Sequence, residues 1–162
     1  MIKNIDTPSP NAIELEDLKI LFNKENYDLL EIKTKSLIQK YPKVPILYNI
    51  LGISQSSRKI FKEAIVNFKK AIELNPQLVD AYNNLGIALK NCGKFLKALD
   101  VYQKALKIDP NHHLINFNLG DLYEKFNEIE KAINCFKKTI VLKPDFNLAY
   151  SNYLFFRNYS DK

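Results

Sequence analysis

One period of 34 residues runs through the sequence and constrains its fold more than any other feature. Prolines recur at this interval at positions 42, 76, 110 and 144, and glycines at positions 52, 86 and 120. Three further series keep the same interval: Leu51, Leu85 and Leu119; Ala64, Ala98 and Ala132; and Tyr27, Phe61, Phe95 and Ile129. A period of this length indicates a repeat protein, in which each repeat buries its apolar face only by stacking on its neighbours.

Within one repeat the apolar residues have the spacing of helices. Leu85 and Leu89 lie on one stripe and Phe95 and Ala98 begin a second, at the three- and four-residue steps of amphipathic helices. A break at residues 91–93 separates the two helices, and the recurring proline ends the second because it cannot continue the helical hydrogen bonds. The small residues predict that the paired helices cross closely where Gly86 faces Ala98. The sequence therefore predicts an all-α fold of antiparallel helix pairs.

The repeat resembles the tetratricopeptide repeat. The family pattern of a bulky residue, Leu-Gly, an aromatic residue, Ala, an aromatic residue, Ala and Pro is matched by Tyr82, Leu85, Gly86, Leu89, Ala98, Tyr102, Ala105 and Pro110. The repeats on either side match it at Tyr48, Leu51, Gly52, Gln55, Ala64, Phe68, Ala71 and Pro76, and at Asn116, Leu119, Gly120, Tyr123, Ala132, Phe136, Thr139 and Pro144. The resemblance implies a right-handed superhelical solenoid whose first helices line a concave groove, and a non-catalytic role in holding a protein or peptide ligand there.

The resemblance also divides the chain. We expect a flexible leader at 1–10 and a repeat domain at 11–159, with repeats at about 11–44, 45–78, 79–112 and 113–146, a final helix at 146–159 and a tail at 160–162. The first repeat departs from the pattern, because Asp17-Leu18 replace Leu-Gly and Leu30 replaces the small residue. We therefore predict that it is a capping repeat.

Composition and charge narrow the class further. Apolar residues make up 46% and charged residues 26% of the chain, as in ordinary globular proteins. The sequence shows neither a secretory signal nor the roughly 18 apolar residues of a membrane helix, so we expect a cytoplasmic protein with reduced Cys92 and Cys135. The net charge of +6 raises nucleic acid as a partner. Scattered lysines and only two arginines, Arg58 and Arg157, argue against it.

No residue pattern predicts catalysis, a cofactor or a metal site. His112-His113 lies between two repeats without further ligands nearby in the sequence, whereas a metal site needs three or four. The two cysteines fit packing better than nucleophilic roles. Neither a Gly-rich phosphate loop nor a Ser-His-Asp order is present. We therefore expect a scaffold that uses no cofactor.

The family arrangement places the groove on the first helix of each pair. The predicted groove residues are Asn49; Asn83, Asn84, Ile87 and Asn91; Phe117, Asn118, Asp121 and Lys125; and Asn152. Asn84, Asn118 and Asn152 keep the 34-residue interval, and an amide side chain can both donate to and accept from the main chain of an extended peptide. This row is similar to the asparagine ladder in the repeat region of O-linked N-acetylglucosamine transferases and their bacterial relatives. The alternative is that these asparagines are solvated residues in a chain rich in asparagine.

Aromatic residues are concentrated in the last helix, where a capping helix would present polar ones. Tyr153, Phe155 and Phe156 form a candidate self-association surface, because exposed apolar patches normally indicate a partner. One interpretation is a homodimer through this C-terminal helix. The other is that the chain is the N-terminal substrate-recognition region of a larger glycosyltransferase-like enzyme. Both remain open beside the leading hypothesis of peptide binding.

Overall fold

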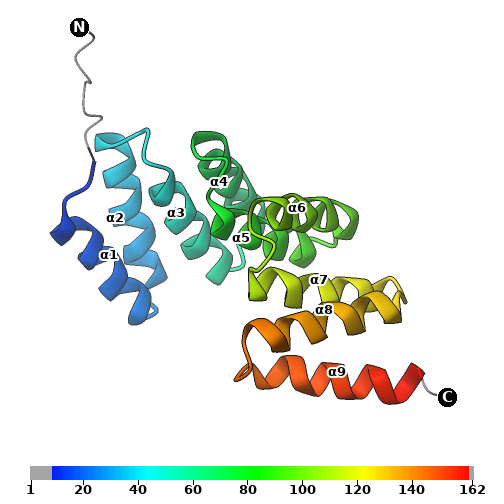
Figure 1. Cartoon of the computed structure of the whole chain (residues 1–162). Coiled ribbons are helices and arrows are strands. Elements are labelled where there is room, and N and C mark those ends of the chain that lie inside the picture. Colours follow the sequence, from blue (N-terminus) through cyan, green and yellow to red (C-terminus); the bar gives the residue numbers. More distant parts are fainter. Residues whose placement is uncertain (1–8, 161–162) are drawn as a thin grey trace, which may run out of the picture. The chain divides into compact units, whose positions relative to one another are not determined.

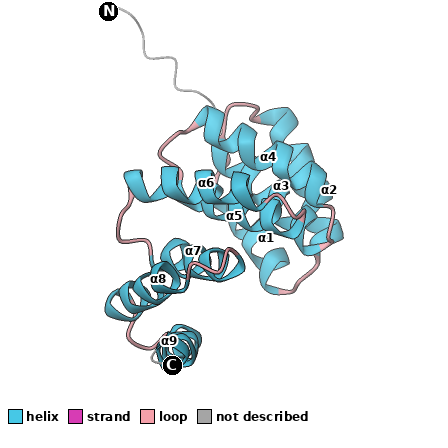
Figure 2. Ribbon diagram, turned by 90° about the vertical axis from the view of Figure 1, so that its right-hand side faces the viewer, coloured by secondary structure: helices cyan, strands magenta, loops and turns pink. Residues whose placement is uncertain are grey.

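The computed structural model describes residues 9–160, which form helices joined by short loops and no strand (Figure 1, Figure 2). The helices are α1 (Ala12–Asn23), α2 (Tyr27–Lys40), α3 (Pro45–Ser57), α4 (Phe61–Leu74), α5 (Val79–Asn91), α6 (Phe95–Ile108), α7 (His113–Lys125), α8 (Ile129–Leu142) and α9 (Asn147–Ser160). The predicted all-α fold of antiparallel helix pairs is confirmed. Most of the predicted leader and the end of the predicted tail lie outside the described residues.

The chain divides into two compact units between Cys92 and Gly93. In unit 1 each of the helices α1 to α4 packs against the helix that follows it, and α3 also contacts α5. In unit 2 the helices α6, α7, α8 and α9 pack in the same sequential way. The contact between α3 and α5 brings the first helices of two successive repeats side by side within unit 1.

The turn inside each helix pair has a left-handed residue that the sequence pattern did not reveal. Glu25, Lys59, Gly93 and Asn127 have φ of 54°, 63°, 69° and 57°, and they stand 34 residues apart. Glycine adopts this conformation without steric cost, and asparagine tolerates it better than most residues. The turn is therefore set by the fold at every repeat, including two where the local residue disfavours it.

A second recurrent contact fixes the loop between repeats. The hydroxyl of Tyr48 donates to the carbonyl of Pro42 at 2.9 Å, and the hydroxyl of Tyr82 donates to the carbonyl of Pro76 at 3.2 Å. In the next repeat the amide Nδ2 of Asn116 takes over this role. The bulky residue that opens the repeat pattern thus anchors the loop that precedes its own helix.

The recurring glycines mark where the two helices of a pair approach most closely. A Cβ atom added to Gly52 would lie 2.5 Å from the ring of Phe68, and one added to Gly120 would lie 2.6 Å from the ring of Phe136. Both rings are fully buried. The predicted close crossing is confirmed in these two pairs. The nearest neighbour of the glycine, however, is the aromatic residue of the second helix and not the expected alanine, so the glycine makes room for an aromatic ring.

The first repeat reverses this arrangement of large and small residues. Leu18 stands at the glycine position, and Thr34 stands at the aromatic position sixteen residues later. Both are fully buried, and the hydroxyl of Thr34 donates a hydrogen bond to the carbonyl of Leu30 at 2.6 Å. The divergence of this repeat is therefore compensated, with the bulk moved from α2 to α1.

Candidate functional site

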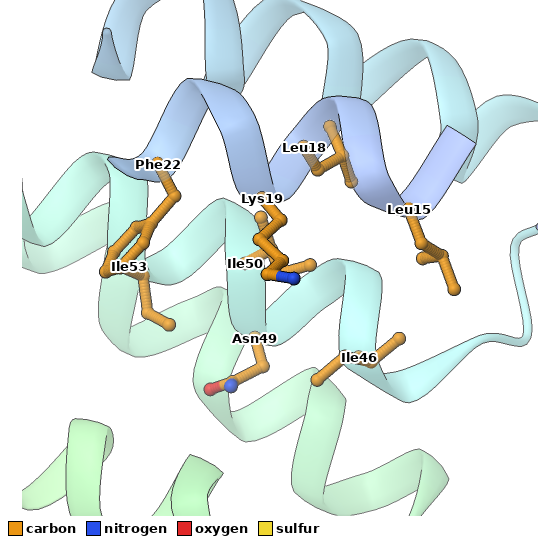
Figure 3. Close-up of a pocket in the computed structure, with 8 residues that line it drawn as sticks. All are labelled: Leu15, Leu18, Lys19, Phe22, Ile46, Asn49, Ile50 and Ile53. Carbon is orange, nitrogen blue, oxygen red and sulfur yellow. The ribbon is translucent and has the colours of Figure 1, made fainter. Parts of the chain in front are cut away.

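An apolar groove lies between α1 and α3 in unit 1. Its volume is about 380 Å³ and it is lined by Leu15, Leu18, Lys19, Phe22, Ile46, Asn49, Ile50 and Ile53 (Figure 3). Each helix contributes residues at steps of three and four, so that one stripe of α1 faces one stripe of α3. The groove therefore forms where the apolar faces of α1 and α3 do not pack fully against each other.

The walls of the groove expose large apolar side chains. Leu15, Phe22 and Ile46 are all exposed, and Phe22 extends from α1 toward Ile53 of α3 (Figure 3). The ring of Phe22 is held edge-on by Tyr27, with ring centroids 6.3 Å apart. An apolar surface of this kind gains free energy when another apolar group covers it.

The predicted groove residues of unit 1 differ in burial and in their contacts. Asn49 and Asn83 are buried. The amide Nδ2 of Asn84 donates to Oδ1 of Asn49 at 3.1 Å, which links α5 to α3. Ile87 is half-buried, and Asn91 is exposed at the end of α5. The structure thus brings Asn49 and Asn84 together, and Asn49 also lines the apolar groove.

In unit 2 the predicted groove residues have different environments. Phe117 is instead buried in the core, with its ring centroid 5.6 Å from Phe136 and 5.0 Å from Phe146. Oδ1 of Asp121 accepts from Nδ2 of Asn152 at 3.5 Å.

Two further predicted residues lie on α7. Asn118 is half-buried, and the Nζ of Lys125 lies 5.9 Å from the ring centroid of Phe95. The predicted groove residues are thus divided between the two units.

The predicted self-association residues divide into core and surface. Phe156 is buried and stacks on Phe136 with ring centroids 6.1 Å apart. Tyr153 is half-buried against the same cluster. Phe155 is 65% exposed. The exposed apolar surface of α9 is completed by other residues, which are Leu148, Tyr150 and Leu154.

The nucleophilic and metal-ligating residue types occupy structural positions. Burial raises the pKa of the Cys135 thiol to about 11, although the charge of Lys138 acts in the opposite direction, so the thiol is protonated at neutral pH. His112 caps α7, with its Nδ1 accepting from the backbone N–H of Ile115 at 3.3 Å. Among residues 9–160, no three His, Cys, Asp or Glu side chains are grouped to hold a metal ion.

No helix in the described part of the chain is both long and apolar enough to cross a membrane.

The stacked helix pairs define a helical repeat protein, and comparison identifies the repeat. Models of the tetratricopeptide repeat match residues 58–93, 79–112 and 101–134. The chain therefore carries tetratricopeptide repeats, and this sequence-based prediction is confirmed. A search of curated proteins found no match.

Solved structures with the same fold include several repeat proteins. The crystal structure of MamA covers 95% of this chain and 87% of its own, with 23% identity and a TM-score of 0.79. YrrB, described as a TPR protein with an unusual peptide-binding site, covers 85% of this chain and 71% of its own, with 25% identity and a TM-score of 0.73. The Arabidopsis OM64 TPR domain covers 70% of this chain and 94% of its own, with 22% identity and a TM-score of 0.67.

Sequence reasoning missed the wall that α1 contributes to the groove. Leu15 and Phe22 belong to the divergent first repeat, which the pattern marked only as a cap. The available signal was the apolar stripe at positions 15, 18 and 22, which continues the first-helix face of the next repeat. The stripe alone does not distinguish a groove wall from a fully buried helix face, because both have apolar residues at the same spacing.

Proposed function

We propose that unit 1 binds a polypeptide segment by receiving its large apolar side chains in the groove between α1 and α3. The observation that carries this proposal is the exposed apolar lining of that groove. The asparagines of α3 and α5 lie at its side and supply polar contacts for the main chain of the bound segment.

The magnitudes favour the apolar groove over the asparagine row as the main source of affinity. Burying one Leu- or Phe-sized side chain contributes about 1.5–3 kcal/mol, whereas one hydrogen bond to a peptide contributes about 0.5–1.5 kcal/mol net. One of the two N–H groups of Asn84 Nδ2 already donates to Asn49, so only part of the hydrogen-bonding capacity of this pair is left for a ligand. The row therefore contributes orientation more than strength.

Comparison with known proteins supports a role in binding polypeptides. Tetratricopeptide repeats match the middle of the chain, and the similar YrrB structure is described as having an unusual peptide-binding site. That the repeats select substrates for a larger glycosyltransferase-like enzyme stays a prediction. The gene sequence beyond codon 162 would test it by showing whether a catalytic region follows.

A random peptide library displayed on phage tests the proposed groove. We expect the wild-type protein to enrich peptides with two or more large apolar residues, and Phe22→Asp and Ile53→Asp each to reduce binding of the enriched peptides at least about tenfold. Ile13→Asp is the matched control, because Ile13 lies on α1, is 76% exposed and does not line the groove. Equal binding by all three variants would contradict the proposal, provided that circular dichroism shows each to be folded.

A second candidate function is self-association through α9, favoured by its exposed Leu148, Tyr150, Leu154 and Phe155. Light scattering over a range of protein concentrations tests it. We expect Phe155→Ser to lower the mean mass, while Val141→Ser, an exposed apolar residue on α8, leaves it unchanged. A parent protein that is monomeric at every concentration would exclude this function.

A further inference from the structure

A cluster of charged and amide side chains surrounds one buried carboxylate where the first repeat meets the second. Glu31 on α2 is only 8% exposed, and its Oε2 accepts from Nη1 of Arg58, the residue that follows α3. Its Oε1 lies 2.6 Å from Nζ of Lys35 and accepts from Nε2 of Gln55 on α3 at 3.5 Å. Arg58 also pairs through Nε with Asp28 of α2 at 2.8 Å.

Gln55 extends this cluster to the next helix. Its Oε1 accepts from Nδ2 of Asn67 on α4 at 2.8 Å, and Asn67 also bonds to the carbonyl of Glu63 at 3.2 Å. The polar contacts therefore run from α2 through α3 to α4, and they fix both the position and the rotation of α2 against α3.

The next junction of unit 1 has apolar residues at the same three places. One repeat further on, Glu31 becomes Ile65, Gln55 becomes Leu89 and Arg58 becomes Cys92. Ile65 and Leu89 are buried. The fold therefore accepts an apolar junction, and the polar one at the first repeat is a feature of this site alone within unit 1.

The position of α1 depends on this junction. Helix α1 packs on α2, and α2 packs on α3, so the docking of α2 sets the distance between the two walls of the groove. Apolar residues also cross this boundary, since Leu18 and Leu30 form one cluster with Leu47 of α3. Two sets of contacts thus hold the α1–α2 hairpin against α3: the apolar cluster, and the charged and amide groups around Glu31.

We propose that the Glu31–Arg58 pair is a latch that docks the α1–α2 hairpin and so controls whether the groove has its second wall. This inference rests on the proposed function, because the groove is the site that the latch would control. Arg58 reaches Glu31 from the end of α3, whereas Lys35 lies on α2 itself. Loss of Arg58 leaves the carboxylate of Glu31 paired with Lys35, but it removes the charged hydrogen bond that ties α2 to α3, and such bonds contribute more than neutral ones. Replacing an ion pair by well-packed apolar residues is often neutral or stabilising, so the hairpin opens more readily when Arg58 is removed than when apolar residues replace the whole pair.

Hydrogen exchange of the full chain tests the latch without any ligand. We expect Arg58→Ala to speed exchange of the amides of α1 and α2 about tenfold, as loss of a hydrogen bond to a charged group implies, with the amides of α4 and α8 unchanged. The triple variant Glu31→Ile, Gln55→Leu and Arg58→Cys copies the next junction, and we expect its α1 and α2 amides to be as protected as in the wild type. The latch would be overturned if Arg58→Ala sped exchange equally in all helices or left the amides of α1 and α2 unchanged. It would also be overturned if the triple variant lost protection in α1 and α2.

Peptide binding by the same variants separates the two proposals. If the groove binds peptides and the latch controls it, Arg58→Ala loses affinity and the triple variant keeps it. If Arg58→Ala opens the hairpin but an enriched peptide binds as before, the latch stands and the groove is wrong. If exchange is unchanged while Phe22→Asp abolishes binding, the groove stands and the latch is wrong.

Discussion

Lys59 has a left-handed backbone (φ 63°) in the turn between α3 and α4, where Gly93 stands one repeat later (φ 69°). A non-glycine residue in this conformation costs about 1–2 kcal/mol relative to its preferred backbone. Glycine avoids that cost, but it loses more entropy on folding. The difference makes the turn a place where single residues change stability without touching the core.

We expect Lys59→Gly to raise the free energy of unfolding by about 0.5–1 kcal/mol, because relief of the left-handed strain exceeds the added entropy cost. Gly93→Ala is expected to lower it by about 1 kcal/mol, and nothing lies within 4 Å of an added Cβ there, so the effect is one of backbone alone. The matched control is Lys69→Gly inside α4, which should lower stability by about 1 kcal/mol. Urea unfolding measures all three, and a destabilising Lys59→Gly would contradict the assignment.

Glu31 links stability to pH. Its burial raises the pKa, but hydrogen bonds from Lys35, Gln55 and Arg58 and the charge of Lys35 outweigh this, so the pKa lies below its ordinary value. The unfolded chain then binds a proton more readily than the folded one, and stability falls as the pH falls. The contribution of Glu31 is complete above the unfolded pKa of about 4.3 and is lost as the pH falls through the folded pKa.

We therefore expect Glu31→Gln to be less stable than the wild type at pH 6 and the difference to shrink at pH 3. Chemical denaturation at the two pH values measures this difference. Glu25→Gln is the control, since Glu25 is exposed and a solvated carboxylate contributes little. A difference that is constant or grows as the pH falls would show that the carboxylate of Glu31 is not held in its charged form.

At the scale of the elements, the helix pairs differ in how they distribute bulk. Gly52 with Phe68 and Gly120 with Phe136 place the large residue on the second helix, whereas the first repeat has Leu18 on the first helix and buried Thr34 on the second. Interiors are packed densely enough that either arrangement works only if both positions change together.

Gly52→Ala is expected to lower the free energy of unfolding by about 1–3 kcal/mol, because its methyl group meets the Phe68 ring. This loss should appear although alanine favours helix over glycine by up to about 1 kcal/mol. Gly52→Leu combined with Phe68→Thr copies the first repeat and should be more stable than the sum of the two single changes predicts, by at least about 1 kcal/mol. If the stability effects of the two single changes simply added in the double variant, the claim that these two positions exchange bulk would be contradicted.

The elements were predictable from the sequence because their signals are local and repeated. The 34-residue interval and the prolines located the helix pairs, and the turn at residues 91–93 was expected where it occurs. The surfaces were less predictable, since Phe117 and Phe156 look like exposed aromatics on helix faces but pack into the core around Phe136. A side chain at such a position is buried or exposed according to the packing of neighbouring helices, which a single repeat does not encode.

At the scale of the whole molecule, the chain is two compact units that share one repeat architecture. Unit 1 carries the apolar groove, the asparagine pair and the polar junction, and unit 2 carries the aromatic core and the exposed face of α9. The central functional claim belongs to unit 1 alone. It requires that a bound polypeptide touch α1 and α3, whatever the position of the other unit.

Isotope labelling of isoleucine methyl groups gives the most direct test of that claim. A peptide enriched from the library is titrated into the labelled protein, and the methyl resonances are followed by NMR. We predict that the signals of Ile46, Ile50 and Ile53 shift with peptide concentration, while those of Ile133 and Ile140 on α8 stay in place. A peptide that binds without moving the three signals of α3 would contradict the account.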